Sequence, residues 1–147
     1  MDFSNIERSK RIHSELENHP LPWVRLAYHR AFVDGDHADE ATALMQTCAG
    51  HPLIRQLIED CLKWPGALLK RHNDAKHIIH KIGLLADIGL DRRIPEIALI
   101  AEKLMGHQSE SGPFQSEIFI PKAFGGSNTA AWDWIICDFP LITSALI

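Results

Sequence analysis

A junction between two apolar helices constrains this fold more than any other stretch of the sequence. The segment 75–88 has helical spacing, Gly89 is suited to end a helix, and Pro95 is suited to begin the next one. The residues between them, 90–94, form a tight turn. We therefore predict two antiparallel helices, over 75–88 and 94–105, joined as a hairpin.

The first of these two helices is expected at the centre of the molecule. Its apolar side chains cover nearly the whole circumference, which is typical of a helix inside a fold. They are Ile78, Ile79, Ile82, Leu84, Leu85, Ala86 and Ile88. Asn73 or Asp74 is expected to cap its N-terminus.

Five further segments have the apolar spacing of helices. They span 4–16, 23–33, a segment capped by Asp36 or Asp39 and stopped by Gly50, 52–64, and a last apolar segment after Pro140. We predict an all-α fold of antiparallel helix hairpins, in which residues 1–147 form a single helical domain. Residues 1–20 are expected to form a peripheral N-terminal helix, because their few apolar residues stand among charges.

A weak internal repeat agrees with helix pairs as the building unit. Pro52, Ile54 and Glu59 recur as Pro95, Ile97 and Glu102. The segment 114–120 alternates like a strand, but a single strand cannot form a sheet. We interpret it as an extended loop or as an edge for a partner.

Composition narrows the class of protein. The chain of 147 residues is 46% hydrophobic with a net charge of −4, and no Lys/Arg run is dense enough for a nucleic-acid partner. No secretory signal and no apolar run of about 20 residues is present, so we expect a cytoplasmic protein without a membrane span. Cys48, Cys61 and Cys137 are predicted to be buried free thiols.

The residues Gln108, Gly112 and Phe114 resemble the glutamine, glycine and aromatic of repeats in α/α-toroid proteins, the terpenoid cyclases and protein prenyltransferases. The resemblance covers 74–147 and implies toroid-like hairpins forming a partial α/α-toroid-like array. It also implies structural roles for Gln108 and Phe114. Phe114 stands where the strongest repeats have tryptophan, and one such repeat is visible.

The resemblance implies fold more than activity, because the catalytic patterns of the family are incomplete. The segment 34–37 ends in histidine where a cyclase acid motif would continue with aspartate. The zinc ligands of protein prenyltransferases have spacings that Asp133, Cys137 and Asp138 do not reproduce.

A candidate ligand pocket comprises His80, Asp87, Trp134, Cys137 and Asp138. Imidazole, carboxylate and thiolate groups are ligands for zinc or iron, so these residue types suit a zinc site, although we predict no cofactor. The plainer interpretation, which we favour, makes His72 and His77 surface residues and His80 a core histidine bonded to one carboxylate.

Two other clusters have simpler explanations. Asp34, Asp36, Asp39 and Glu40 suit a hard cation, but carboxylates before a helix commonly serve as caps. The glycine-rich segment 125–127 lacks the strand and the lysine of a phosphate loop, and we interpret it as a turn.

We expect a helical module that binds an apolar small molecule or a protein partner through the concave face of its hairpins. The alternative is a terpenoid-cyclase or prenyltransferase-like enzyme, or a fragment of one. The C-terminal apolar segment, with Leu141, Ile142, Leu146 and Ile147, is expected to mediate self-association or to contact a protein partner, because burying each side chain stabilises by about 1.5–3 kcal/mol.

Overall fold

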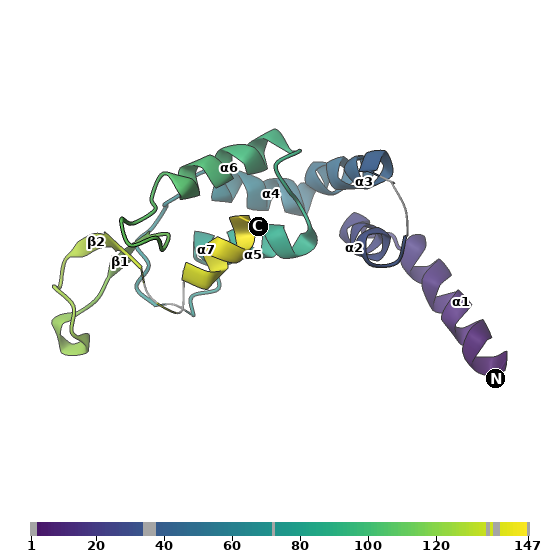
Figure 1. Ribbon diagram of the computed structural model, residues 1–147, viewed down its shortest axis with the longest axis horizontal. Helices are drawn as coiled ribbons and strands as arrows, with labels where there is room; N and C mark the ends of the chain where they lie inside the picture. Colours follow the sequence, from purple (N-terminus) through teal and green to yellow (C-terminus); the bar gives the residue numbers. More distant parts are fainter. Residues whose placement is uncertain (1–2, 34–37, 72, 135, 137–138, 147) are drawn as a thin grey trace.

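The computed structural model is mostly helical, with one small sheet (Figure 1). It describes residues 3–33, 38–71, 73–134, 136 and 139–146. The elements are α1 (Phe3–Glu17), α2 (Pro22–Phe32), α3 (Ala38–Gly50), α4 (Pro52–Cys61), α5 (Ile78–Ile88), α6 (Pro95–Met105), β1 (Ser116–Phe119), a 3-10 helix η1 (Lys122–Phe124), β2 (Ala130–Asp133) and α7 (Phe139–Leu146). The predominantly helical class is thereby confirmed.

The expectation of an all-α chain is wrong at one end of the molecule. Strand β1 pairs antiparallel with β2, with Ser116 opposite Asp133 and Phe119 opposite Ala130. The partner strand was not predicted because it contains two alanines and an aspartate, which are weak strand formers. Figure 1 shows the two strands and η1 extending away from the helices.

The helix starts follow local backbone rules. Pro22, Pro52 and Pro95 each stand in the first turn of a helix, where the missing backbone N–H has no partner to lose. The two prolines of the predicted repeat therefore occupy equivalent places, at the starts of α4 and α6. Gly89 ends α5 in the left-handed conformation, at φ 93°.

The predicted start of α5 needs correction. The helix begins at Ile78 rather than Ala75, and neither Asn73 nor Asp74 caps it. Asp74 instead closes the preceding turn, where its side chain accepts a bond from the backbone N–H of Lys76 (3.1 Å). The capping residue is His77.

His77 is buried, with 7% of its surface exposed, so its assignment to the surface is wrong. Its Nδ1 accepts a bond from the backbone N–H of Ile79 (3.3 Å), and its Nε2 lies 2.8 Å from the carbonyl oxygen of Ala67. An Nδ1 that accepts leaves the ring proton on Nε2, which donates to that carbonyl. The imidazole thus ties the start of α5 to the preceding loop.

We expect His77→Ala to lower the free energy of unfolding by about 1–2 kcal/mol, because the helix loses its capping acceptor. Urea unfolding followed by circular dichroism at 222 nm measures the change. His77→Asn is the matched control, since asparagine is a good capping residue and should retain most of the stability. Equal destabilisation by both substitutions would show that capping is not the role of His77.

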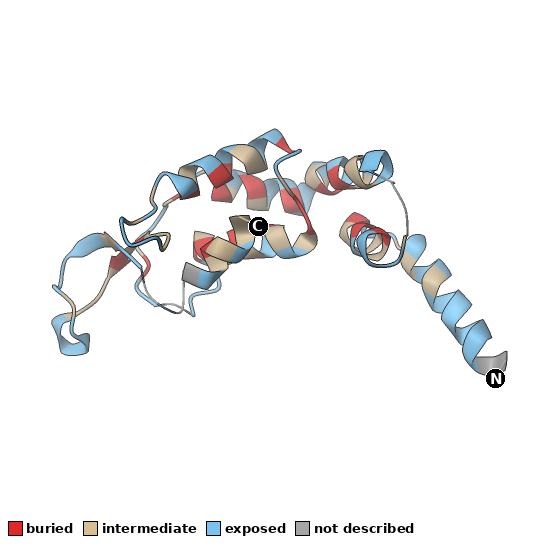
Figure 2. Ribbon diagram, in the orientation of Figure 1, coloured by how far each residue is buried: buried red, intermediate tan, exposed pale blue. Residues whose placement is uncertain are grey.

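The core is built around α5, which packs against α4, α7 and α2. Figure 2 shows the buried residues on the facing sides of these helices. The side chains with the least exposure are Leu26, Met45, Cys48, Cys61, Ile79, Leu104 and Ile142. One edge of α5 faces solvent, at Leu84 and Asp87, so the expected place of Leu84 among the inward-facing apolar side chains is wrong.

Helix α7 covers part of α5. Ile142 is fully buried there, and Leu141 and Leu146 are half-buried against the core. The chain itself therefore covers much of the apolar segment that was expected to require a partner.

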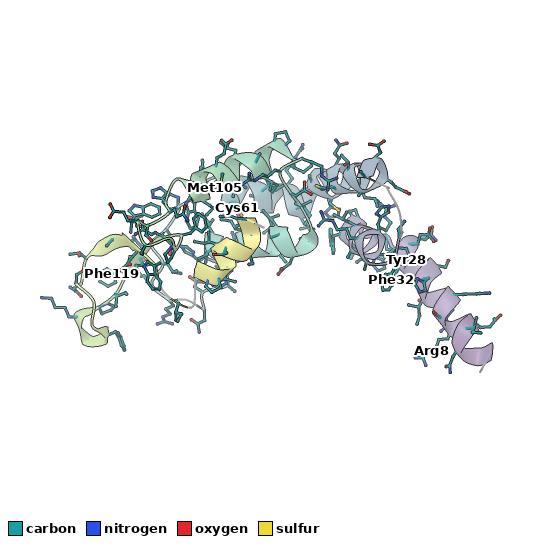
Figure 3. All side chains as sticks on the ribbon, in the orientation of Figure 1. Arg8, Tyr28, Phe32, Cys61, Met105 and Phe119 are labelled. Atoms are coloured by element: carbon teal, nitrogen blue, oxygen red, sulfur yellow. The ribbon has the colours of Figure 1, made fainter. Side chains whose placement is uncertain are left out.

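Helix α1 extends from the rest of the molecule and packs against α2 (Figure 1). His13 is half-buried, and its ring meets those of Tyr28 and Phe32 edge-on, at centroid distances of 5.7 and 5.2 Å. Figure 3 shows both aromatic residues beside α1. In the described part of the chain, no helix combines the length and the apolar character needed to cross a membrane.

Candidate functional site

The structure describes three of the five predicted pocket residues, His80, Asp87 and Trp134. His80 and Asp87 lie seven residues apart on α5, about 10 Å along the helix axis. Trp134 follows β2 and is 40% exposed. Cys137 and Asp138, like His72, lie outside the described residues. Among the residues that are described, no group of three or more His, Cys, Asp or Glu side chains could hold a metal ion.

A side-chain hydrogen bond and a β-bridge hold the turn over residues 108–114. The Gln108 side-chain amide donates to the carbonyl oxygen of Gly112 (2.7 Å), and Gln108 and Phe114 form an isolated antiparallel bridge. Phe114 is half-buried against the core. Nearby, the ring of His107 stacks on Trp132 with centroids 3.5 Å apart.

The structure describes two of the four residues in the predicted acidic cluster, Asp39 and Glu40. Asp39 and Glu40 occupy the first turn of α3, where negative charge is favourable near the helix N-terminus. Asp34 and Asp36 lie outside the described residues. Glu40 Oε2 lies 3.4 Å from Nε2 of the buried His29 on α2.

The most perturbed carboxylate lies between α4 and α5. Asp60 accepts bonds from Lys81 (2.7 Å) and Lys63 (3.1 Å), and these bonds lower the pKa of Asp60 to about 2. Beside it, burial raises the pKa of the Cys61 thiol to about 12. Burial also raises the pKa of Cys48. Both are free, buried thiols, as predicted, and both stay protonated near neutral pH.

A groove of about 490 Å³ lies between the α5–α6 turn, α6 and α7, and we take it as the candidate site because it combines apolar and charged lining residues. We call it the arginine groove. Its floor is apolar and its rim is charged. The floor consists of Ala86, Leu90, Ile97, Ala101, Ala145 and Leu146, and the rim carries Arg30, Asp91, Arg92, Arg93 and Ser144.

The floor of the groove continues toward the core. Ala86, Leu90, Ile97, Ala101 and Ala145 also line a cavity of about 20 Å³, whose other walls are core side chains of α5 and α6. Such a lining is wholly apolar and offers water no hydrogen-bond partner among its side chains. An apolar group on the floor would therefore meet further apolar surface beneath it.

Asp91 organises the rim. Its Oδ2 accepts bonds from Arg93 Nη2 (2.7 Å) and Arg30 Nη2 (3.2 Å), and its Oδ1 accepts from the backbone N–H of Arg93 (3.0 Å). The hydrogen bonds from Arg93 lower the pKa of Asp91, and the charge of Arg30 acts in the same direction. Arg93 also donates to Thr42 Oγ1 (2.9 Å), which connects the turn to α3.

Arg92 has a different environment. Its Nη2 donates to Met105 Sδ (3.3 Å), a weak acceptor without charge. Met105 is the last residue of α6, and Figure 3 shows it at that end of the helix. The rim therefore carries three guanidinium groups against one carboxylate, which leaves two positive charges.

Gly89 allows Arg30 to reach the rim. A Cβ atom at Gly89 would lie 2.5 Å from Arg30 Nη1 and 3.1 Å from Arg30 Cζ, so the guanidinium packs directly on the glycine backbone. This glycine also ends α5, whose last carbonyl groups favour a nearby cation. The turn between α5 and α6 thus also forms a wall of the groove.

Residues 90–94 were predicted only as a turn, and the groove was not predicted. A signal was present, because Asp91, Arg92 and Arg93 are consecutive charged residues between two apolar segments. Arg30 had no such signal, since it stands 61 residues before Asp91. Comparisons with family models, with curated proteins and with solved structures found no match to this chain.

Proposed function

We propose that this chain is a helical binding module whose arginine groove holds an apolar molecule bearing an anionic group. The observation that carries the proposal is the pairing of an apolar floor with a positively charged rim in one concavity. Small-molecule sites usually have volumes of about 300–1,000 Å³, with apolar walls and a few polar groups that orient the ligand. The groove has this composition and size.

The rim is suited to an anion rather than to a neutral polar group. Guanidinium groups donate to carboxylate and phosphate oxygens in a planar, paired geometry. Arg30, Arg92 and Arg93 all line the groove, and Asp91 neutralises one of their charges. An anionic head would lie at this rim while its apolar body covers Leu90, Ile97 and Leu146.

Substitution at Ser144 tests this proposal. Ser144 is an exposed residue of α7 on the groove rim, so Ser144→Trp should occlude the groove without disturbing the core. We expect isothermal titration calorimetry to detect decyl phosphate or decanoate binding to the unchanged protein. Decanol, which lacks the charge, should bind at least tenfold more weakly. Ser144→Trp should weaken the binding of the anion at least tenfold.

Thr47→Trp is the matched control. Thr47 is likewise an exposed hydroxyl residue on a helix, and its side chain bonds a carbonyl oxygen of the same helix, as that of Ser144 does. It lies on α3 outside the groove lining, so binding should be unchanged. The proposal is wrong if neither anion binds, or if Ser144→Trp binds as well as the unchanged protein.

The alternative function, a terpenoid-cyclase or prenyltransferase-like enzyme, stays a prediction, as does the resemblance of 74–147 to α/α toroids. None of His80, Asp87 and Trp134 lines the arginine groove. We therefore base the proposed function on the groove rather than on those residues.

A further inference from the structure

We infer that Asp91 acts as an internal competitor for the ligand head, so that the arginine groove selects a doubly charged phosphate monoester over a carboxylate. This inference rests on the proposed binding function. It concerns the chemistry of the head group and names Asp91 as the residue that determines specificity.

Asp91 already makes the contacts that a ligand carboxylate would make. Arg93 Nη2 (2.7 Å) and Arg30 Nη2 (3.2 Å) converge on its Oδ2. Arg93 Nε lies 3.0 Å from Oδ1 and 3.2 Å from Oδ2. The side chain thus engages two guanidinium groups, one of them through both carboxylate oxygens.

The carboxylate is also fixed in place. Its Oδ1 accepts the backbone N–H of Arg93, two residues along the same turn (3.0 Å). A group held by its own backbone competes at a high effective concentration, in the millimolar range for short connections. To bind Arg30 and Arg93, a free carboxylate of the same charge and geometry would have to displace Asp91, and the exchange would form no new kind of contact.

A phosphate monoester differs in charge and in the number of acceptors. It carries about −1.5 to −2 near pH 7 and has three acceptor oxygens. With Asp91 in place the rim has two uncompensated positive charges, which a dianion matches and a carboxylate only half neutralises. Arg92, which donates to the uncharged Met105 Sδ, supplies donors without displacing Asp91.

The test compares decyl phosphate with decanoate by calorimetry at pH 7.5 and fixed ionic strength. We expect the unchanged protein to bind decyl phosphate at least tenfold more tightly than decanoate. In Asp91→Asn, decanoate should bind at least fivefold more tightly, and the preference for phosphate should fall below threefold. Asp87→Asn is the control, because Asp87 is an exposed carboxylate of α5 outside the groove lining, and its preference should be unchanged.

Arg92→Gln provides a second variant that leaves the Asp91 network intact. The Arg92 side chain is exposed, and its loss should weaken decyl phosphate at least fivefold while changing decanoate less than twofold. Equal affinity of the unchanged protein for the two anions would overturn the inference and leave the proposed function standing. An unaltered preference for phosphate in Asp91→Asn or in Arg92→Gln would also overturn the inference and leave the proposed function standing. Absence of binding by both anions would instead overturn the proposed function.

Discussion

Ile79→Ala is expected to lower the free energy of unfolding by about 2–5 kcal/mol. Ile79 is 1% exposed on the inner side of α5, so the substitution removes buried methyl and methylene groups and leaves a cavity in the core. Few single changes in this chain should cost as much, because α5 lies between α4, α7 and α2. Urea denaturation at 25 °C, followed by circular dichroism, measures the difference.

Leu84→Ala is the control for Ile79→Ala on the same helix. Leu84 is 46% exposed on the solvent edge of α5, so its truncation removes less buried surface and creates no enclosed cavity. Alanine is also the best helix former, which offsets part of the loss. We expect a change below about 1 kcal/mol. Equal effects of the two substitutions would contradict the orientation of α5 described above.

Gly89→Ala is expected to destabilise the protein by about 1–2 kcal/mol through backbone strain alone, because φ is 93° and an L side chain rarely adopts that conformation. The added Cβ would also push Arg30 away from the turn, since it would lie 2.5 Å from Arg30 Nη1. The bond from Arg30 to Asp91 should weaken as a result. Thermal and urea unfolding measure the loss of stability.

Gly50→Ala separates this effect from the general consequences of replacing glycine. Gly50 ends α3 without a positive φ, and a Cβ there would meet no atom within 4 Å. The substitution should leave stability unchanged or raise it by about 0.4–1 kcal/mol, because alanine reduces the entropy of the unfolded chain. Destabilisation by Gly50→Ala equal to that of Gly89→Ala would show that the left-handed turn is not the cause.

The parts of the fold that sequence analysis predicted well are those governed by local backbone chemistry. Proline cannot supply an N–H inside a helix, so Pro22, Pro52 and Pro95 predicted helix starts that the structure confirms. Glycine tolerates positive φ, so Gly89 predicted the end of α5. In each case the residue restricts its own conformation whatever surrounds it.

Features that depend on a distant partner were predicted less well. Strand β1 alternates as strands do, but its partner contains Ala130 and Ala131, which have no pattern of their own. The burial of His77 depends on the carbonyl of Ala67, which approaches from the preceding loop. Neither pairing leaves a periodic signal in the sequence.

The arginine groove likewise combines features that local sequence sets with features that depend on distant partners. The sequence by itself determined that a tight turn containing Asp91, Arg92 and Arg93 joins two apolar helices, because glycine and proline act within their own residues. Only the tertiary structure decided that Arg30 packs over Gly89 and that α7 closes the apolar floor. Those contacts join segments far apart in the chain, and they form only when burial of the shared core brings α2 and α7 against α5, and α7 against α6.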